Sequence, residues 1–413
     1  MKKLMMIAAA LSALVASAEI TITGVSARQS WPWNSLVDVD FTIGGTAGEA
    51  YAIDISATAA GGDKKLCATT FVTEPIASVG KNRIVWDLGA DYPNFKADDL
   101  RVTVTATPFS DTASVYLVVD LSGGTSAAKW PVRYTTAAPV HTPGAEDPCK
   151  TTELWLKRVK AGNGTDGYGS GGGYLSSGTG YYAAHSYVLT NDYYLGVFEL
   201  TQAQCYNISG SYNSYFTADR ATRPVDSITY KNLRWGLFNP SSPNAALESG
   251  VVKNLRDRTG LKFDLPTEWQ WVHACKAGSS GTRYSGASES NTRNSGNANP
   301  PSDYEYYGTK ANWSADYGTS YVDAYDPNPW GFYGMLGNVW EFCLNNRLSV
   351  TQGETYTDPL GTGAGNNTRY YRGGSWGQAY SNLQSHYGNK SGTYSTDTCT
   401  WYAGARICLT IGR

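Results

Sequence analysis

Apolar and polar residues alternate in several short segments near the start of the chain. Residues 37–43 place Asp or Thr between the apolar side chains of Val37, Val39, Phe41 and Ile43, and residues 53–56 and 102–105 repeat this pattern. A period of two is typical of strands with one buried face, and clusters such as Gly61-Gly62-Asp63 mark turns. Residues 19–110 therefore predict an all-β sandwich of the immunoglobulin or fibronectin type.

The next part of the chain has a different pattern. Residues 115–121 form an apolar run that predicts a strand, and a Thr-, Ala- and Pro-rich stretch follows as far as Pro148. We interpret residues 111–151 as a connecting segment with a strand. A Gly/Ser tract then occupies residues 162–180. Its composition fits either a flexible linker or a long loop within the next domain.

One helix start stands out in the second half of the chain. Pro266, Thr267 and Glu268 place a hydroxyl and a carboxylate near a first turn, and Trp269, Val272 and Cys275 follow at helical spacing, so this face is expected in the core. The Gly-rich residues 331–338 predict a tight loop. Residues 377–400 are rich in Tyr, Ser, Asn and Gly, and we interpret them as loops.

Composition excludes several classes of protein. The 413 residues are 41% hydrophobic and 16% charged, and the formal net charge is -2. A nucleic-acid binder needs a basic footprint, and a disordered chain needs a lower apolar content. The 30 Tyr and 13 Trp suit exposed binding surfaces, because each ring has an apolar face and a polar tip.

The first 18 residues predict a secretory signal peptide. Lys2 and Lys3 precede an apolar stretch, and Ala16-Ser17-Ala18 is a small-residue cleavage site. No later apolar segment reaches the roughly 18 residues of a membrane span. We expect a secreted or periplasmic protein without a membrane span.

Seven cysteines remain after the signal peptide: Cys67, Cys149, Cys205, Cys275, Cys343, Cys399 and Cys408. Disulfides are expected in an oxidising compartment, and an odd number leaves at least one cysteine outside an internal pair. The four histidines are scattered and no CxxC occurs, so zinc is not expected.

Several short motifs then occur in a fixed order. They are the segments 154–162, 193–202, Arg223-Pro224-Val225, Leu265-Pro266-Thr267-Glu268-Trp269, 328–341, Arg372-Gly373-Gly374-Ser375-Trp376 and Gly404-Ala405-Arg406. In this order they resemble the formylglycine-generating enzyme, or sulfatase-modifying factor, family over residues 152–413. The resemblance implies an α+β fold of the irregular C-type-lectin-like kind, with long loops.

Catalytic members of that family bind Cu(I) through two cysteines placed just after the R-G-G-S-W motif, because soft sulfur ligands select Cu(I). Here the first position is Gln378 and the second lies near Leu383. Ser375 and Trp340 match pocket positions of the family. The resemblance therefore implies a protein without copper, in which formylglycine formation is not expected.

The resemblance also implies a disulfide and calcium. Cysteines at the positions of Cys275 and Cys408 form a pair in the family. A first calcium site resembles Asn312, the carbonyl of Trp313, and Asp316. A second resembles the carbonyls of Gly337 and Val339 with the Glu341 carboxylate, and Gly334 stands where the family has Asp or Asn. Carbonyl and carboxylate oxygens are the ligands that calcium prefers. The alternative is that Asn338 and Glu341 only hold their loop by hydrogen bonds.

Three functions stay open at this point. The first is a non-catalytic module that binds a protein or glycan through a Tyr/Asn/Ser-rich face, with the candidate residues Tyr380, Asn382, His386, Tyr387, Asn389 and Tyr394. The second is a divergent oxidase that acts on cysteine-bearing protein substrates. The third is a structural component of the cell envelope. An ordinary Tyr-rich surface would explain residues 377–400 as well. The oligomeric state has no signal in the sequence.

Overall fold

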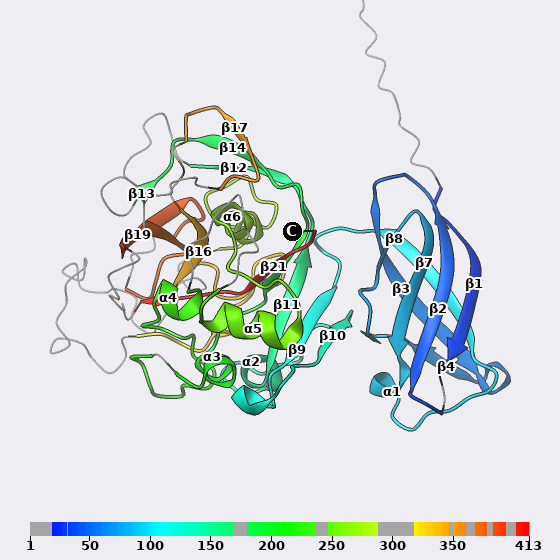
Figure 1. The fold of residues 1–413 in the computed structure, drawn as a ribbon. Coiled ribbons are helices and arrows are strands. Elements are labelled where there is room, and N and C mark those ends of the chain that lie inside the picture. The colour runs from blue at the N-terminus through cyan, green and yellow to red at the C-terminus, as the bar shows by residue number, and fades with distance from the viewer. Residues whose placement is uncertain are drawn as a thin grey trace, which may run out of the picture. The chain divides into compact units, whose positions relative to one another are not determined.

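The computed structural model describes residues 19–30, 32–167, 180–212, 214–235, 247–287, 318–346, 348, 350–360, 368–377, 383–393 and 402–412. The expected signal peptide lies outside these residues. The chain divides into two compact units, Met1–Phe109 and Ser110–Arg413 (Figure 1).

The described part of the first unit consists of strands and two short helical turns. The elements are β1 (Thr21–Gln29), β2 (Leu36–Gly44), β3 (Ala50–Ala59), η1 (Ala60–Gly62), β4 (Lys64–Cys67), β5 (Thr70–Phe71), β6 (Ile76–Ser78), β7 (Gly80–Asp87), α1 (Leu88–Asp91) and β8 (Arg101–Pro108). One sheet has the order β1-β2-β7-β5, and in the other β3 pairs with β4, β6 and β8. All of these pairings are antiparallel.

The alternation in the sequence corresponds to the faces of these strands. Val37, Val39, Phe41 and Ile43 of β2 are at most 2% exposed, and Ile53 and Ile55 of β3 are 1% exposed. Their polar neighbours point to the other face of each strand, because successive side chains of a strand alternate. The prediction of half-buried strands in these segments is confirmed.

The described part of the second unit contains three sheets. The elements are β9 (Tyr116–Asp120), η2 (Gly124–Ser126), β10 (Val132–Thr135), α2 (Pro148–Thr151), β11 (Glu153–Val159), β12 (Asn163–Asp166), β13 (Gly180–Tyr181), β14 (His185–Val188), β15 (Tyr193–Gly196), α3 (Gln202–Ser209), α4 (Tyr230–Leu233), α5 (Val251–Thr259), α6 (Glu268–Lys276), β16 (Trp340–Asn346), β17 (Thr355–Thr357), β18 (Thr368–Arg372), β19 (Tyr387–Thr393), β20 (Ala403–Gly404) and β21 (Cys408–Thr410). The sheet orders within this unit are β10-β9-β11-β15-β21, β12-β14-β17 and β13-β19-β18-β16-β20.

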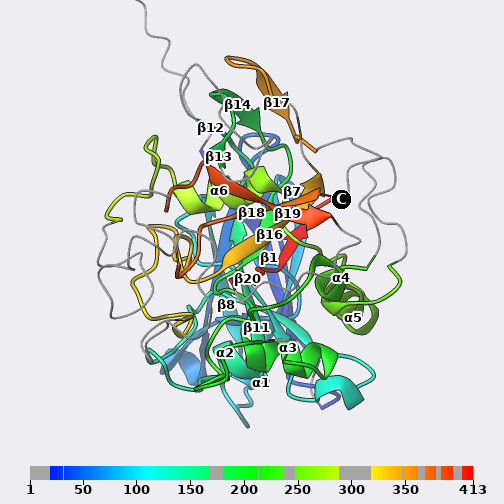
Figure 2. The ribbon, with the colours of Figure 1, turned by 90° about the vertical axis from the view of Figure 1, so that its left-hand side faces the viewer.

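The sheet β13-β19-β18-β16-β20 lies across the middle of this unit, with α6 against it (Figure 2). Successive side chains of β16 enter two different core clusters, since Phe342 and Leu344 belong to one and Cys343 belongs to the other. Tyr371 and Tyr370 of β18 divide in the same way. This mixture of helices and sheets is the α+β architecture expected for the C-terminal region.

The helix predicted at residue 268 is present. Thr267 accepts a hydrogen bond from the Gln270 backbone, and the Gln270 side chain accepts one from the Thr267 backbone, so the two form a capping box. Trp269, Val272 and Cys275 are fully buried. None of the helices in the described ranges combines the length and the apolar character needed to cross a membrane.

Two segments differ from their predictions. The strand predicted within residues 111–151 is present as β9, whose central residues Leu117, Val118 and Val119 are fully buried. These residues belong to the second compact unit rather than to a connector, because β9 pairs with β10 and β11. Residues 377–400 are not all loop, since β19 pairs with β18 and β13. Pairing of the backbone with neighbouring strands makes β19 a strand although its sequence lacks an apolar alternation.

Candidate functional site

Charged residues from separate motifs meet in a buried network in the second unit. Glu341 of β16 accepts hydrogen bonds from Arg406, with 2.8 Å between Oε1 and Nη2 and 3.0 Å between Oε2 and Nε. Trp271 of α6 donates its indole N–H to Glu341 Oε2 at 2.7 Å. These three side chains are at most 1% exposed. The network therefore ties α6, β16 and the segment before β21 together.

Glu199 is a second buried carboxylate at this network. It accepts hydrogen bonds from Asn338 Nδ2 at 2.6 Å and from the Val339 backbone at 3.2 Å. Burial, and then the charge of Glu341, raise the pKa of Glu199 well above its ordinary value, and Arg406 opposes them. A β-carbon on Gly334 would stand 2.9 Å from Glu199 Oε2. Crowding by Glu199 thus accounts for glycine where the family has Asp or Asn.

The expected second calcium site does not fit these contacts. Both oxygens of Glu341 already accept hydrogen bonds from Arg406, whose positive charge would repel a cation at the same carboxylate. Gly337 and Val339 lie on the same loop, and their carbonyls alone make a poor calcium site. Asn312, Trp313 and Asp316 of the expected first site lie outside the described residues.

The position expected for the second catalytic thiol is part of the core. Leu383 is fully buried in the cluster that contains Trp269 and Trp271. It packs against Gly374, where an added β-carbon would stand 2.4 Å from Leu383 Cδ2. Ser375 and Trp340 are buried as well, at 3% and 1% exposed. Gln378 lies outside the described residues.

The expected ligand face is described only in part. His386 is 3% exposed and belongs to the interior, where burial lowers its pKa to about 4. Tyr387 is half-buried and stacks on Trp340, with ring centroids 6.2 Å apart. Only the backbone of Asn389 is described, in β19. Tyr380, Asn382 and Tyr394 lie outside the described residues. The two described side chains therefore pack inward in this structure.

The expected disulfide is absent from the structure. Cys275 and Cys408 are both buried in the same core cluster, and no disulfide joins them. Cys275 Sγ lies 3.9 Å from the carbonyl of Met335, and Cys408 Sγ lies 3.7 Å from Gln270 Oε1. Burial raises the pKa of Cys275, which keeps this thiol protonated.

A second buried network surrounds Arg372 of the R-G-G-S-W motif. Arg372 Nη2 donates to Asp166 Oδ2 at 2.9 Å, and its Nε donates to Glu268 Oε1 at 3.1 Å. Tyr182 and Asn345 each donate to Glu268 Oε2. The side chains of the three charged residues are 0% exposed. Arg372 therefore joins β18, β12 and the start of α6, which is a structural role.

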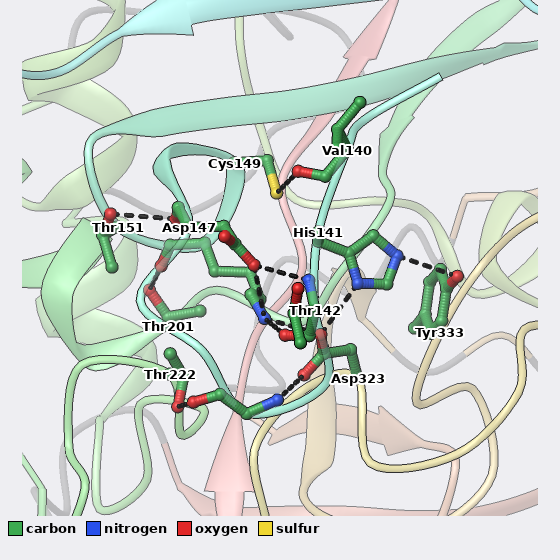
Figure 3. Close-up of polar contacts among 12 residues, drawn as sticks. Val140, His141, Thr142, Asp147, Cys149, Thr151, Thr201, Thr222, Asp323 and Tyr333 are labelled. Carbon is green, nitrogen blue, oxygen red and sulfur yellow. Dashed lines mark hydrogen bonds and ion pairs between the residues drawn. The ribbon is translucent and has the colours of Figure 1, made fainter.

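A third network joins His141 and Lys150, in the segment predicted as a connector, to Asp323 and Tyr333 (Figure 3). Asp323 Oδ2 accepts from His141 Nδ1 at 2.9 Å and from Lys150 Nζ at 2.6 Å. The other ring nitrogen of His141 lies 3.0 Å from the Tyr333 hydroxyl. Burial raises the pKa of Tyr333, so its hydroxyl stays protonated rather than becoming a nucleophile. This Asp–His–Tyr arrangement holds residues 141–150 against residues 323–333.

The sequence predicted Glu268 only as a carboxylate at a helix start, and it predicted no contact for Glu199, Arg372 or Arg406. The available signal was that each of these charged residues stands inside one of the ordered motifs. His141, Lys150 and Asp323 lie outside these motifs, so the sequence did not mark them as candidates. Within the described ranges no group of three His, Cys, Asp or Glu side chains could hold a metal ion. These networks join the helices and strands of an α+β scaffold through internal ion pairs and hydrogen bonds.

Comparison with known proteins identifies this scaffold. The family described as "FGE-sulfatase: Sulfatase-modifying factor enzyme 1-like domain" matches residues 170–408. The match covers more than half of the chain, and the chain belongs to this family, as its motifs implied. The formylglycine-generating enzyme of Streptomyces coelicolor is 33% identical over 115 residues, which are 27% of this chain and 35% of that enzyme. The chain thus spans about a third of the enzyme's length.

Solved structures with a similar fold include Treponema denticola variable protein 1, with a TM-score of 0.46 and 19% identity over 66% of this chain and 99% of that chain. PvdO from Pseudomonas aeruginosa has a TM-score of 0.40 and 16% identity over 66% of this chain and 100% of that one.

Proposed function

We propose that the chain is an exported, non-catalytic ligand-binding member of the sulfatase-modifying factor family. The observation that carries the proposal is Leu383, an aliphatic side chain buried at the position expected for the second copper-binding thiol. A leucine cannot bind Cu(I), which takes soft sulfur ligands.

The state of the described cysteines supports the same proposal. Burial raises the pKa of Cys149 to about 12, and burial also raises the pKa of Cys275 and of Cys343 well above the ordinary value. A metal ligand must be the thiolate, and these residues favour the neutral thiol. Cys67 is exposed, but it lies in the first unit.

The proposed ligand face is the Tyr/Asn/Ser-rich tract of residues 377–400. Half-buried Tyr387 of β19 stacks on the buried ring of Trp340. We propose that Tyr380, Asn382, Asn389 and Tyr394 of this tract contact a protein or glycan. Tyrosine gives large contact area at low entropic cost, and Asn and Ser give adaptable hydrogen bonds.

Copper binding and turnover test the non-catalytic part. The full chain is titrated with Cu(I) against a competing chelator, and oxygen consumption is followed with a cysteine-bearing peptide. We expect neither stoichiometric copper binding nor turnover. Oxygen consumption coupled to oxidation of the peptide cysteine would instead establish the divergent oxidase.

Binding to arrays of glycans and extracellular proteins tests the ligand face. We expect Tyr380→Ala and Tyr394→Ala to abolish a signal that the full chain gives. Tyr206→Ala is the matched control, because Tyr206 is 45% exposed on α3. A signal that all three variants retain would place the ligand elsewhere.

Export and the first unit complete the proposal. We infer cleavage after Ala18, so N-terminal sequencing of secreted protein should begin at Glu19. We also infer that the two antiparallel sheets of the first unit make an immunoglobulin- or fibronectin-like sandwich that serves as a spacer or adaptor. An uncleaved chain retained in the cytoplasm would contradict export.

A further inference from the structure

A pocket of about 390 Å³ opens between β12 and the C-terminal end of α6, in the second unit. This size falls within the range of about 300–1,000 Å³ that is typical of small-molecule sites. None of its lining residues belongs to residues 377–400, so the inference below does not rest on the proposed ligand face. The side chains used in the argument are those of Asp111, Asn163, Tyr187, His273, Lys276 and Trp330.

One side of the pocket is aromatic. His273 contacts Trp330 edge to face, with ring centroids 5.2 Å apart, and it contacts Tyr187 in the same manner at 6.0 Å. The Tyr187 hydroxyl lies 3.2 Å from His273 Nδ1. Burial lowers the pKa of His273 to about 4, so this ring is neutral at pH 7. The aromatic side therefore presents uncharged rings with polar edges.

Glycine backbone packs directly against these aromatic rings. A β-carbon on Gly164 would stand 2.4 Å from the Tyr187 hydroxyl, and one on Gly162 would stand 3.0 Å from His273 Cε1. Side chains at these two positions would therefore collide with the rings. Glycine at both positions lets the backbone lie close to the aromatic side of the pocket.

The polar groups of the pocket offer both donors and acceptors. Lys276 donates to the Thr165 carbonyl at 2.7 Å, and an ammonium has three donors. Asp111 Oδ1 accepts from the Lys160 backbone at 2.7 Å, and its second oxygen is a further acceptor. Asn163 is exposed at the rim and has an amide that both donates and accepts. One anionic and one cationic side chain balance, so the lining has no net charge.

We propose that this pocket binds a neutral saccharide ring of one or two units. A sugar ring has an apolar face and hydroxyls that both donate and accept hydrogen bonds. Tyr187 is 1% and Trp330 9% exposed, so the apolar face would lie mainly against the half-buried His273 ring. An anion would meet Asp111, and a cation would meet Lys276. The desolvation that lowers the pKa of Lys276 and raises that of Asp111 also penalises a charged ligand.

The test uses the full chain with glucose, galactose, mannose, N-acetylglucosamine and cellobiose as probes, in saturation-transfer NMR and titration calorimetry. We expect at least one probe to bind, and Asn163→Ala to weaken it by about tenfold, the loss of one hydrogen bond. Asn163 is exposed, so this variant should fold. Lys276→Met should weaken binding similarly, whereas Lys129→Met, an exposed lysine outside the pocket, should not.

Three results would overturn the proposal. They are no binding of any of the five sugars, equal binding by wild type and Asn163→Ala, or binding of a zwitterion such as phenylalanine in preference to the sugars. None of these results bears on the variants of Tyr380 and Tyr394. Failure of this pocket and failure of the proposed ligand face are therefore distinguishable.

Discussion

In the second unit, the loss of a charged residue from a buried ion pair should lower stability far more than the loss of one from an exposed pair. Glu341 and Arg406 are each at most 1% exposed and satisfy one another, together with Trp271. Removing one charge from such a pair leaves the other buried without compensation. An exposed pair has water as an alternative partner and matters little.

We expect Glu341→Gln to lower the free energy of unfolding by about 3–5 kcal/mol, because Arg406 then remains charged in the core. Lys253→Ala is the control, since Lys253 pairs with Asp257 on the surface of α5 and its loss should cost about 0.3–0.5 kcal/mol. Urea unfolding followed by tryptophan fluorescence measures both. Similar small costs for the two variants would show that the buried pair contributes little.

A comparison of alanine variants at Gly374 and Gly353 distinguishes the cost of backbone strain from the cost of overpacking. Their φ values are +79° and +80°, but only Gly374 faces a close neighbour, Leu383, where an added β-carbon meets Cδ2 at 2.4 Å. Both alanine variants incur the cost of a positive φ, about 1–2 kcal/mol. Gly374→Ala should cost about 1–3 kcal/mol more through overpacking. Equal costs in thermal unfolding would contradict the packing of Leu383 described above.

At the scale of elements, capping fixes where helices begin. The boxes Thr201–Gln204, Thr229–Asn232 and Thr267–Gln270 open α3, α4 and α6. Each satisfies backbone N–H groups that the first turn leaves without a helical partner. The box at Thr267 is the one that places Trp269 and Trp271 in the core.

We expect Thr267→Ala to destabilise the protein by about 0.5–2 kcal/mol and Thr267→Ser to retain most of the stability, because serine keeps the capping oxygen. Chemical unfolding of the two variants beside wild type measures the difference. If serine were as costly as alanine, the threonine methyl group rather than the cap would carry the effect.

At the scale of the whole molecule, a neutral buried histidine links stability to pH. The pKa of His273 is about 4 in the folded protein, against about 6.5 in an unfolded chain. Between these values the unfolded state binds a proton that the folded state does not. The contribution is therefore fully present above pH 6.5 and is lost as the pH falls toward 4.

We expect wild type to lose about 2 kcal/mol more stability than His273→Gln between pH 7.5 and pH 4.5, since the variant has no imidazole to protonate. Denaturant unfolding at the two pH values measures this difference. Parallel losses in the two proteins would mean that His273 is protonated equally in both states.

Local patterns in the sequence predict part of this architecture correctly. Alternation identified the buried faces of β2 and β3, the Pro-Thr-Glu start identified α6, and the ordered motifs identified the family. These features are local because they depend on the period of a strand or helix and on a cap within one turn.

The tertiary structure alone decided which distant residues meet. Glu341 carries a carboxylate that suits calcium in the sequence, yet Arg406, 65 residues away, occupies it. His141 and Asp323 pair across 182 residues. The sequence predicted the strand β9 but not its partners β10 and β11, and β19 became a paired strand in a segment that was taken as loops. The period of a segment reports which of its faces is buried, whereas the partner of a buried charge depends on which distant segments pack against it.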